Sequence, residues 1–126
     1  MAVPFKAPVK DITFGYEVID SYNILNKISE FSDFSEDIVI PTMEECAKFS
    51  EEVLAPINAI GDQQGATIDN GVVKMPQEFV DAYKKFAEAG WASISLPEEI
   101  GGGGQPITLS GGTLEILSTA NLAFGL

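Results

Sequence analysis

Four consecutive glycines, Gly101 to Gly104, are the first feature of the sequence that could bind a ligand. Glycine-rich loops can surround phosphate groups with their backbone N–H groups. The run lacks the G-x-x-x-x-G-K-[ST] pattern of a nucleoside-triphosphate loop, and the dinucleotide pattern G-x-G-x-x-G fails because Pro106 stands where the third glycine should be. We therefore predict a loop between two helices, since these glycines add backbone freedom and bring no side chain to pack.

Paired acidic residues, Glu44-Glu45 and Glu98-Glu99, are the second candidates for chemistry. Adjacent residues on a helix or loop do not face one another, which favours solvated charges over an acid–base pair. The sequence also has no histidine, the usual general base and the commonest metal ligand. We therefore expect neither a catalytic residue nor a metal ligand in this chain.

Cys46 and Trp91 are each the one residue of their type in the chain, and we interpret both as core residues. A lone cysteine can form neither an intrachain disulfide nor a cysteine cluster for zinc. The two carboxylates that precede Cys46 are expected to raise the pKa of its thiol and so to keep it unreactive. Trp91 follows Gly90, which is expected to end a helix, and its ring is interpreted as a packing anchor.

The charge balance limits the possible partners. The chain has 19 Asp and Glu residues against 7 Lys, with no Arg, and a formal net charge of -12. Such a surface repels the phosphates of nucleic acids and anionic membranes, so neither is an expected partner. The opening residues lack the apolar region of a signal peptide, and no stretch reaches the roughly 20 apolar residues of a membrane span. We expect a cytoplasmic protein.

The N-terminal half of the sequence predicts two helices of unequal length. Asp11 can cap a short helix that extends toward Leu25. Ser35 can cap the next and longest helix. Pro41 and Pro56 each remove a backbone donor, so we expect an irregular start near the first and a kink or break near the second. The apolar stripe of this long helix consists of Ile38, Val39, Met43, Cys46, Ala47, Ser50, Val53, Leu54 and Ile57.

A short hairpin and another helix follow. Asn70-Gly71 supplies the positive φ angles of a tight type I′ turn, with a short strand on each side. Pro76 is expected at the first position of a helix that carries apolar residues on one face until Gly90 ends it.

The last predicted helix begins near Ile107 or Thr108 and is mostly apolar. Its residues from Ser110 to Gly112 have small side chains or none, although a glycine inside a helix lowers the stability by about 1 kcal/mol relative to alanine. We therefore expect another segment to pack closely against these residues. The final residues, Asn121 to Leu126, carry no side-chain charge, which indicates that a partner surface covers them.

These patterns together predict an all-α fold with about four main helices and one small β-hairpin. A length of 126 residues is enough for one domain with its own core. We expect a single helical domain over residues 1–126. Within it, residues 1–34 form an N-terminal extension with a short helix, and residues 35–126 form the helical core.

Several segments follow one another in an order and spacing that are informative together: Phe49 to Pro56, Gly61-Asp62, Gly90-Trp91, Pro97 to Gly104, Leu114 to Leu117, and Asn121. In this order they resemble the N-terminal helical domain of the acyl-CoA dehydrogenases. The opening from Pro4 to Asp11 is similar to the start of the larger bacterial members, including the 3-methylmercaptopropionyl-CoA dehydrogenase type. The chain departs from the family's pattern at Ile100, where an aromatic residue is commoner, and at Gln105-Pro106, which replaces a more apolar step.

The resemblance implies the oxidation of an acyl-CoA thioester to a 2-enoyl-CoA. In the family a glutamate base removes the α proton and FAD accepts the β hydride. A middle β domain holds much of the flavin, and a C-terminal helical domain usually bears the glutamate. This chain is expected to stop before both domains, so the resemblance assigns it no catalytic and no flavin-binding residue. FAD would belong to the complete enzyme, and the chain alone is expected to bind none and to be inactive.

The resemblance also suggests substrate-contacting residues. In the family the last helix of this domain and the turn after it form a wall of the acyl pocket. Leu117, Asn121, Phe124 and Leu126 are the candidates for that wall. The alternative is that these residues pack against the domains that follow in a complete enzyme.

Three accounts of function are open from the sequence. In the first, the chain is the N-terminal portion of an FAD-dependent acyl-CoA dehydrogenase, present as a fragment, a truncated gene product or one half of a split enzyme. In the second, it is a helical protein-interaction or self-association module without enzymatic activity. In the third, it is an inactive structural remnant. The expected partners are the remaining domains of such an enzyme or another copy of the chain, with acyl-CoA bound only in a complete enzyme.

Overall fold

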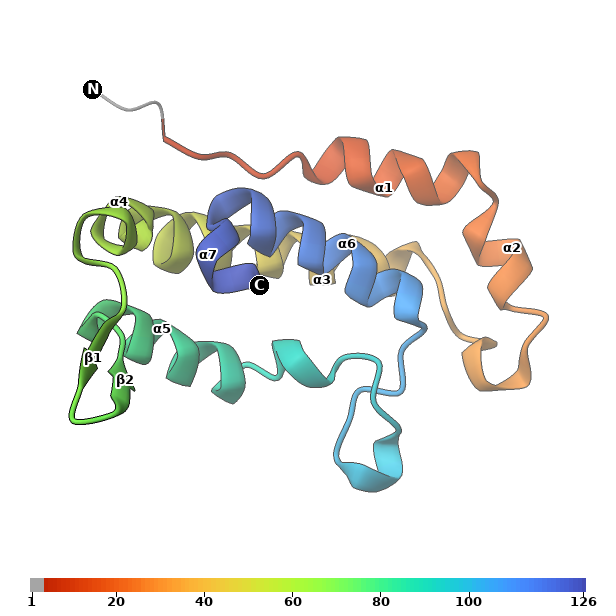
Figure 1. Ribbon diagram of the computed structural model, residues 1–126. Coiled ribbons are helices and arrows are strands. Elements are labelled where there is room, and N and C mark those ends of the chain that lie inside the picture. Colours follow the sequence, from red (N-terminus) through yellow and green to blue (C-terminus); the bar gives the residue numbers. More distant parts are fainter. Residues whose placement is uncertain (1–3) are drawn as a thin grey trace.

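Helices form most of the protein, and the predicted all-α fold with one small hairpin is confirmed. A computed structural model describes residues 4–126. Figure 1 shows α6 in the middle of the molecule, with α1 on one side of it, α5 on the other, and the rod of α3 and α4 behind it. In chain order the elements are α1 (Val9–Val18), α2 (Ser21–Leu25), η1 (Ser29–Phe31), α3 (Glu36–Phe49), η2 (Ser50–Leu54), α4 (Ala55–Gln64), β1 (Thr67–Asp69), β2 (Val72–Lys74), α5 (Gln77–Glu88), η3 (Trp91–Ser93), η4 (Glu98–Ile100), α6 (Ile107–Ala120) and α7 (Leu122–Gly125).

The predicted N-terminal helix is present but divided in two. α1 begins at Val9, so Asp11 lies within its first turn and does not cap it. The backbone turns at Asp20, whose φ angle of 55° is left-handed, and α2 follows. The Nδ2 of Asn23 donates a hydrogen bond of 2.6 Å to Oδ1 of Asp20. Aspartate adopts this conformation more readily than most residues, which a helical periodicity alone does not reveal.

Both prolines of the long helix lie within one continuous helical rod. The predicted irregular start near Pro41 is wrong, because α3 begins at Glu36 and contains Pro41. The backbone carbonyl of Asp37 loses its helical donor, but both residues are exposed, so water can replace that donor. The predicted break near Pro56 takes the form of the π-helical η2, after which α4 continues. Ser35 occupies the N-cap position as predicted, although its side chain makes no capping hydrogen bond.

The core lies where α3 and η2 pack against α6, with α1 packed against α3. Tyr16 of α1 is buried, and its hydroxyl donates a hydrogen bond of 2.6 Å to the backbone carbonyl of Thr108 at the start of α6. Cys46 is a buried core residue, as predicted. The fully buried residues that join these elements are Phe34, Val39, Met43, Cys46, Ser50, Leu54, Leu109 and Ile116.

Trp91 packs against this core but is only half-buried. Its ring lies beside that of Phe49, with centroids 6.2 Å apart. The indole Nε1 of Trp91 is buried and has no hydrogen-bond partner among residues 4–126. Trp91 is therefore a packing residue at the edge of the core, and the prediction of a core residue is confirmed only in part.

The hairpin has the turn that the sequence predicts. Asn70 and Gly71 both have positive φ angles, 50° and 79°, as a type I′ turn requires. β1 and β2 pair antiparallel, with Asp69 opposite Val72. All six strand residues are exposed, so the hairpin projects from the helices as a ribbon.

The glycine run forms the predicted loop, and its backbone is held in place. The N–H groups of Gly101, Gly102, Gly103 and Gly104 all donate to backbone carbonyls within residues 93–98. A side chain at Gly102 or Gly103 would collide with the backbone of Leu96 or Ile94 respectively, so these positions need glycine for close approach.

Adjacent glycines of α6 have opposite environments. A Cβ atom at Gly112 would lie 2.7 Å from the hydroxyl of Tyr16 and would also collide with the Met43 side chain. A Cβ atom at Gly111 would meet no atom within 4 Å. The close packing predicted for the small residues of this helix is therefore confirmed at Gly112, whereas no described residue packs against Gly111, which faces outward.

This difference predicts opposite effects of two neighbouring substitutions. Gly111→Ala should raise the free energy of unfolding by up to about 1 kcal/mol, because alanine favours the helix and meets no other atom. Gly112→Ala gains the same helix propensity, but it should leave the protein about 1 to 3 kcal/mol less stable than Gly111→Ala because it overpacks the core. Urea denaturation of both variants measures the difference. Equal stabilities would contradict the close contact at Gly112.

Candidate functional site

The outer face of α6 carries an uncharged strip of residues, which we call the α6 stripe: Ile107, Gly111, Leu114 and Ser118. Their spacing of four, three and four residues places them on one side of the helix. Ile107 is 76% exposed and Leu114 is 52% exposed. The opposite face of α6 is buried in the core. Two large exposed apolar side chains on the outer face make the α6 stripe a candidate contact surface.

The four residues predicted for the pocket wall lie in different environments. Leu117 and Asn121 are buried, with 5% and 1% of their surface exposed. Phe124 is half-buried on α7, and Leu126 is 98% exposed. The structure thus places two of these residues inside the domain and two at its surface. The sequence analysis did not select Ile107, Leu114 and Ser118 as candidate site residues. They are uncharged and recur at helical spacing, and this pattern could have identified them.

Asn121 determines the path of the chain after α6. Its backbone is extended, with φ -157° and ψ 93°. α6 therefore ends before it, at Ala120, and α7 begins after it, at Leu122. Its side-chain Nδ2 donates a hydrogen bond of 3.1 Å to the backbone carbonyl of Leu54. Its Oδ1 accepts one of 3.2 Å from the backbone N–H of Phe124. One buried amide therefore caps α7 and links it to η2, 67 residues away in sequence.

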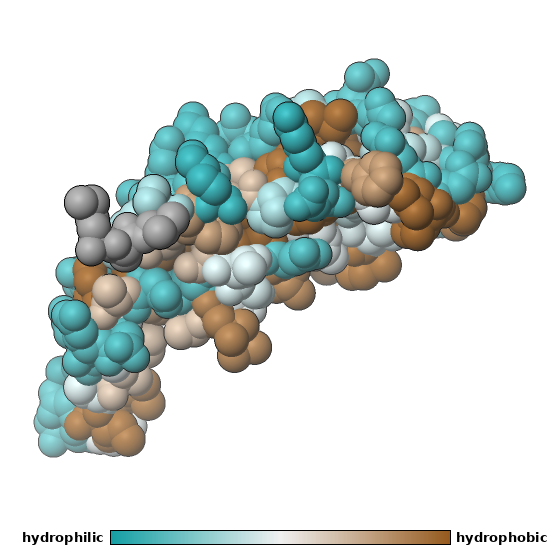
Figure 2. Space-filling model, turned by 90° about the horizontal axis from the view of Figure 1, so that it is seen from above, coloured by the Kyte–Doolittle hydropathy of each residue, from teal (hydrophilic) through white to brown (hydrophobic). Residues whose placement is uncertain are grey.

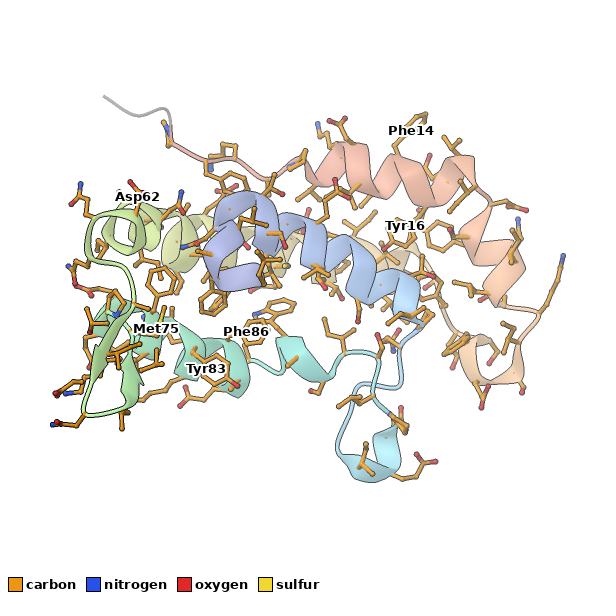
Figure 3. The ribbon with its side chains drawn as sticks, viewed as in Figure 1. Phe14, Tyr16, Asp62, Met75, Tyr83 and Phe86 are labelled. Carbon is orange, nitrogen blue, oxygen red and sulfur yellow. The ribbon has the colours of Figure 1, made fainter. Side chains whose placement is uncertain are left out.

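Phe124 contributes to an apolar groove beside α5. Its ring lies 5.6 Å from that of Phe86 and 6.3 Å from that of Phe79, between ring centroids. Figure 3 shows Met75 beside the hairpin, with Tyr83 and Phe86 further along α5. The groove has a volume of about 310 Å³ and is lined by Met75, Phe79, Val80, Tyr83, Ala123 and Phe124. Its size and apolar lining suit an apolar group.

A second depression, which we call the α1/α6 groove, lies between α1 and α6. Its volume is about 400 Å³. It combines apolar side chains with two carboxylates and contains no basic side chain. The lining residues are Asp11, Ile12, Gly15, Tyr16, Ile19, Thr108, Gly112 and Glu115.

The residues that resemble catalytic groups are inert in this structure. Burial raises the pKa of the Cys46 thiol to about 12, so the thiol is protonated at neutral pH. The predicted cause was wrong, because burial and not the neighbouring carboxylates dominates the shift. Burial likewise raises the pKa of Tyr16 to about 12. Within residues 4–126 no group of three or more Cys, Asp or Glu side chains could hold a metal ion.

Comparisons with known proteins match the chain to one family. The family model described as "Acyl-CoA dehydrogenase, N-terminal domain" matches residues 41–126. Over 122 residues the chain is 35% identical to a 3-methylmercaptopropionyl-CoA dehydrogenase of Ruegeria pomeroyi. That similarity covers 97% of this chain and 21% of the relative, so the chain spans about a fifth of the relative's length. In the part of the chain that the structure describes, no helix has the length and apolar character of a membrane span.

The two bonds of Asn121 lead to a stability prediction. Asn121→Ala should lower the free energy of unfolding by about 1 to 3 kcal/mol, because it leaves the buried carbonyl of Leu54 without this donor. It should also speed hydrogen exchange at the amide of Phe124, which loses its side-chain acceptor and keeps only the backbone carbonyl of Asn121. Chemical denaturation and NMR-detected exchange measure the two effects.

Asn23→Ala is the matched control, because Asn23 is exposed and bonds only locally. It should change the stability by less than about 0.5 kcal/mol. If the two variants were equally stable, the proposed anchoring role of Asn121 would be wrong.

Proposed function

Because this chain belongs to the acyl-CoA dehydrogenase family, we propose that it forms the N-terminal portion of an FAD-dependent acyl-CoA dehydrogenase, which oxidises an acyl-CoA to a 2-enoyl-CoA. The family match over residues 41–126 carries this proposal. The α6 stripe supports it, because an exposed uncharged helix face needs a further surface to cover it. The partners are then the other domains of the complete enzyme, and its compartment is the cytoplasm.

We infer that the α6 stripe contributes to the wall of the acyl pocket. An acyl chain is bound by apolar, uncharged surface, which the stripe provides. Gly111 presents no side chain, so a ligand could approach the helix backbone closely there. We propose that Phe124 and Leu126 add apolar surface to this wall after the end of α6, while the buried Leu117 and Asn121 support it from inside the domain. In this proposal the first two can touch substrate and the last two position the wall.

We propose that the described residues do not form an FAD site by themselves. FAD carries a diphosphate, which proteins bind with free N–H groups or with cations. The N–H groups of Gly101 to Gly104 already donate to backbone carbonyls. The α1/α6 groove carries the carboxylates of Asp11 and Glu115 and no cation, so it repels a diphosphate. We therefore propose that the rest of a complete enzyme holds the flavin, and that this chain alone binds FAD weakly or not at all.

A second account, an interaction or self-association module without enzymatic activity, is favoured by one observation. The hairpin exposes Ile68, Val72 and Val73, and Leu126 is almost fully exposed at the end of the chain. Apolar surface of this kind tends to associate with a partner. Under this account the chain would act without the other domains of an enzyme.

For the purified chain alone, we predict no dehydrogenase activity and no tightly bound flavin. The reason is that hydride transfer needs a positioned cofactor and base, which the other domains would supply. The chain is mixed with FAD, an electron-accepting dye and either 3-methylmercaptopropionyl-CoA or a straight-chain acyl-CoA. Dye reduction that requires both the chain and the acyl-CoA would contradict the proposal, as would a yellow chain after gel filtration.

A chimera tests the proposal directly. We predict that the Ruegeria pomeroyi relative, with its matching segment replaced by this chain, binds FAD and oxidises its acyl-CoA substrate. Leu114→Asp in the chimera should lower kcat/KM about tenfold or more, because a charge would enter the apolar wall. Ile100→Asp is the control, since Ile100 is an exposed apolar residue on the loop away from the α6 stripe.

Three results would count against the proposal. A chimera that folds and binds FAD but does not turn over would show that this chain cannot serve as the N-terminal portion of such an enzyme. Equal activity of Leu114→Asp and the unsubstituted chimera would remove the α6 stripe from the pocket wall. An equal loss of kcat/KM in Ile100→Asp would show that a charge added elsewhere on the domain has the same effect, so the effect would not be specific to the α6 stripe.

A further inference from the structure

The outer surface of α1 carries two large apolar side chains beside the exposed charges of Lys10 and Glu17. Phe14 is 61% exposed, and Val18, one turn later, is 64% exposed. Figure 3 shows Phe14 pointing away from the fold, while Tyr16 points into it. Seen from the side of α1, apolar areas interrupt the hydrophilic surface (Figure 2). α1 thus presents apolar side chains to the outside as well as to the core.

The α1/α6 groove adjoins this surface and is open at Gly15. A Cβ atom at Gly15 would meet nothing within 4 Å, so no described residue requires a glycine there for packing. A glycine inside a helix costs stability relative to alanine. Because Gly15 has no side chain, the groove has room there for the side chain of a partner. Ile12 and Ile19 are its apolar walls.

Two carboxylates border the groove without a cation. Asp11 and Glu115 make no ion pair within residues 4–126, where the ion pairs formed are those of Glu51, Asp69 and Asp81. A second copy of this chain is a poor occupant, because each copy carries a net charge of -12 and the two would repel. A basic occupant is the complement of this surface.

From this surface we propose that the α1/α6 groove docks a basic amphipathic helix of a partner protein. A Lys or Arg side chain of that helix lies in the groove between the carboxylates of Asp11 and Glu115. Its apolar side chains cover Phe14 and Val18. α1 lies before the residues that the family model matches, 41–126, but the similarity to the relative extends over 97% of this chain. The proposed partner is a separate protein, so the peptide experiment can fail while the proposed dehydrogenase function holds.

The experiment uses the whole chain and a model peptide. The probe is a fluorescein-labelled helical peptide of about 16 residues, long enough to hold a helix in water, with Leu on one face and Lys beside it. A second peptide replaces every Lys with Glu. We expect the Lys peptide to bind in a fluorescence anisotropy titration, more weakly as salt rises, and the Glu peptide not to bind.

Three variants of the chain locate the binding. The double variant Asp11→Asn and Glu115→Gln should weaken binding of the Lys peptide about fivefold or more, as expected for the loss of two exposed ion pairs. Gly15→Leu should fill the groove and abolish binding. The double variant Glu88→Gln and Glu99→Gln removes the same charge from exposed positions elsewhere and should bind as the unsubstituted chain does. Circular dichroism checks that each variant keeps its helical content.

Each other outcome overturns the proposal. If the Lys peptide does not bind, or if the Glu peptide binds equally well, the groove does not recognise a basic helix by its charge. An equal loss in the Glu88 and Glu99 control shows attraction to the whole acidic surface and not to the groove. Full binding by Gly15→Leu places the peptide elsewhere. A chain that sediments as a dimer, and as a monomer with Gly15→Leu, assigns the groove to a second copy.

Discussion

The close approach of α6 to the α1–α3 layer at Gly112 is the contact on which the rest of the structure depends. With no side chain at Gly112, the Met43 side chain and the Tyr16 hydroxyl lie directly against the α6 backbone. Tyr16 can then donate its hydrogen bond to Thr108, which holds the start of α6 against α1. Three elements far apart in sequence thus meet at one glycine, and the buried core forms around that point.

The two ends of α6 are held by different buried polar contacts. At its start the hydroxyl of Tyr16 bonds the carbonyl of Thr108. After its end Asn121 bonds the carbonyl of Leu54 and caps α7. Buried polar groups cost free energy unless they find partners, so these bonds limit how the helix can shift. The inner face of α6 is therefore placed precisely, and the α6 stripe on its outer face is placed with it.

The features that would suggest chemistry have structural roles instead. The glycine run holds a tight loop with its own N–H groups, and Cys46 fills space between α3 and α6. The acidic residues that carry the net charge lie mostly at the surface. What distinguishes the domain is the location of apolar surface outside the core: on the α6 stripe, along α1 and on the hairpin. These are the places where a domain of this family can meet its surroundings.

The sequence by itself determined several local elements, because they depend on interactions between near neighbours. The Asn70-Gly71 turn, the helix that ends before Gly90 and the start of α6 near Ile107 all follow from backbone preferences and helical spacing. The order of short segments was also sufficient to identify the family.

Only the tertiary structure decided which side of each helix packs against another element. Gly111 and Gly112 look alike in sequence, but one faces solvent and the other faces Met43. The burial of Leu117 and Asn121 and the exposure of Leu126 also depend on the fold, because the orientation of α6 is set by contacts with η2 and α1 that are 67 and 92 residues away in sequence.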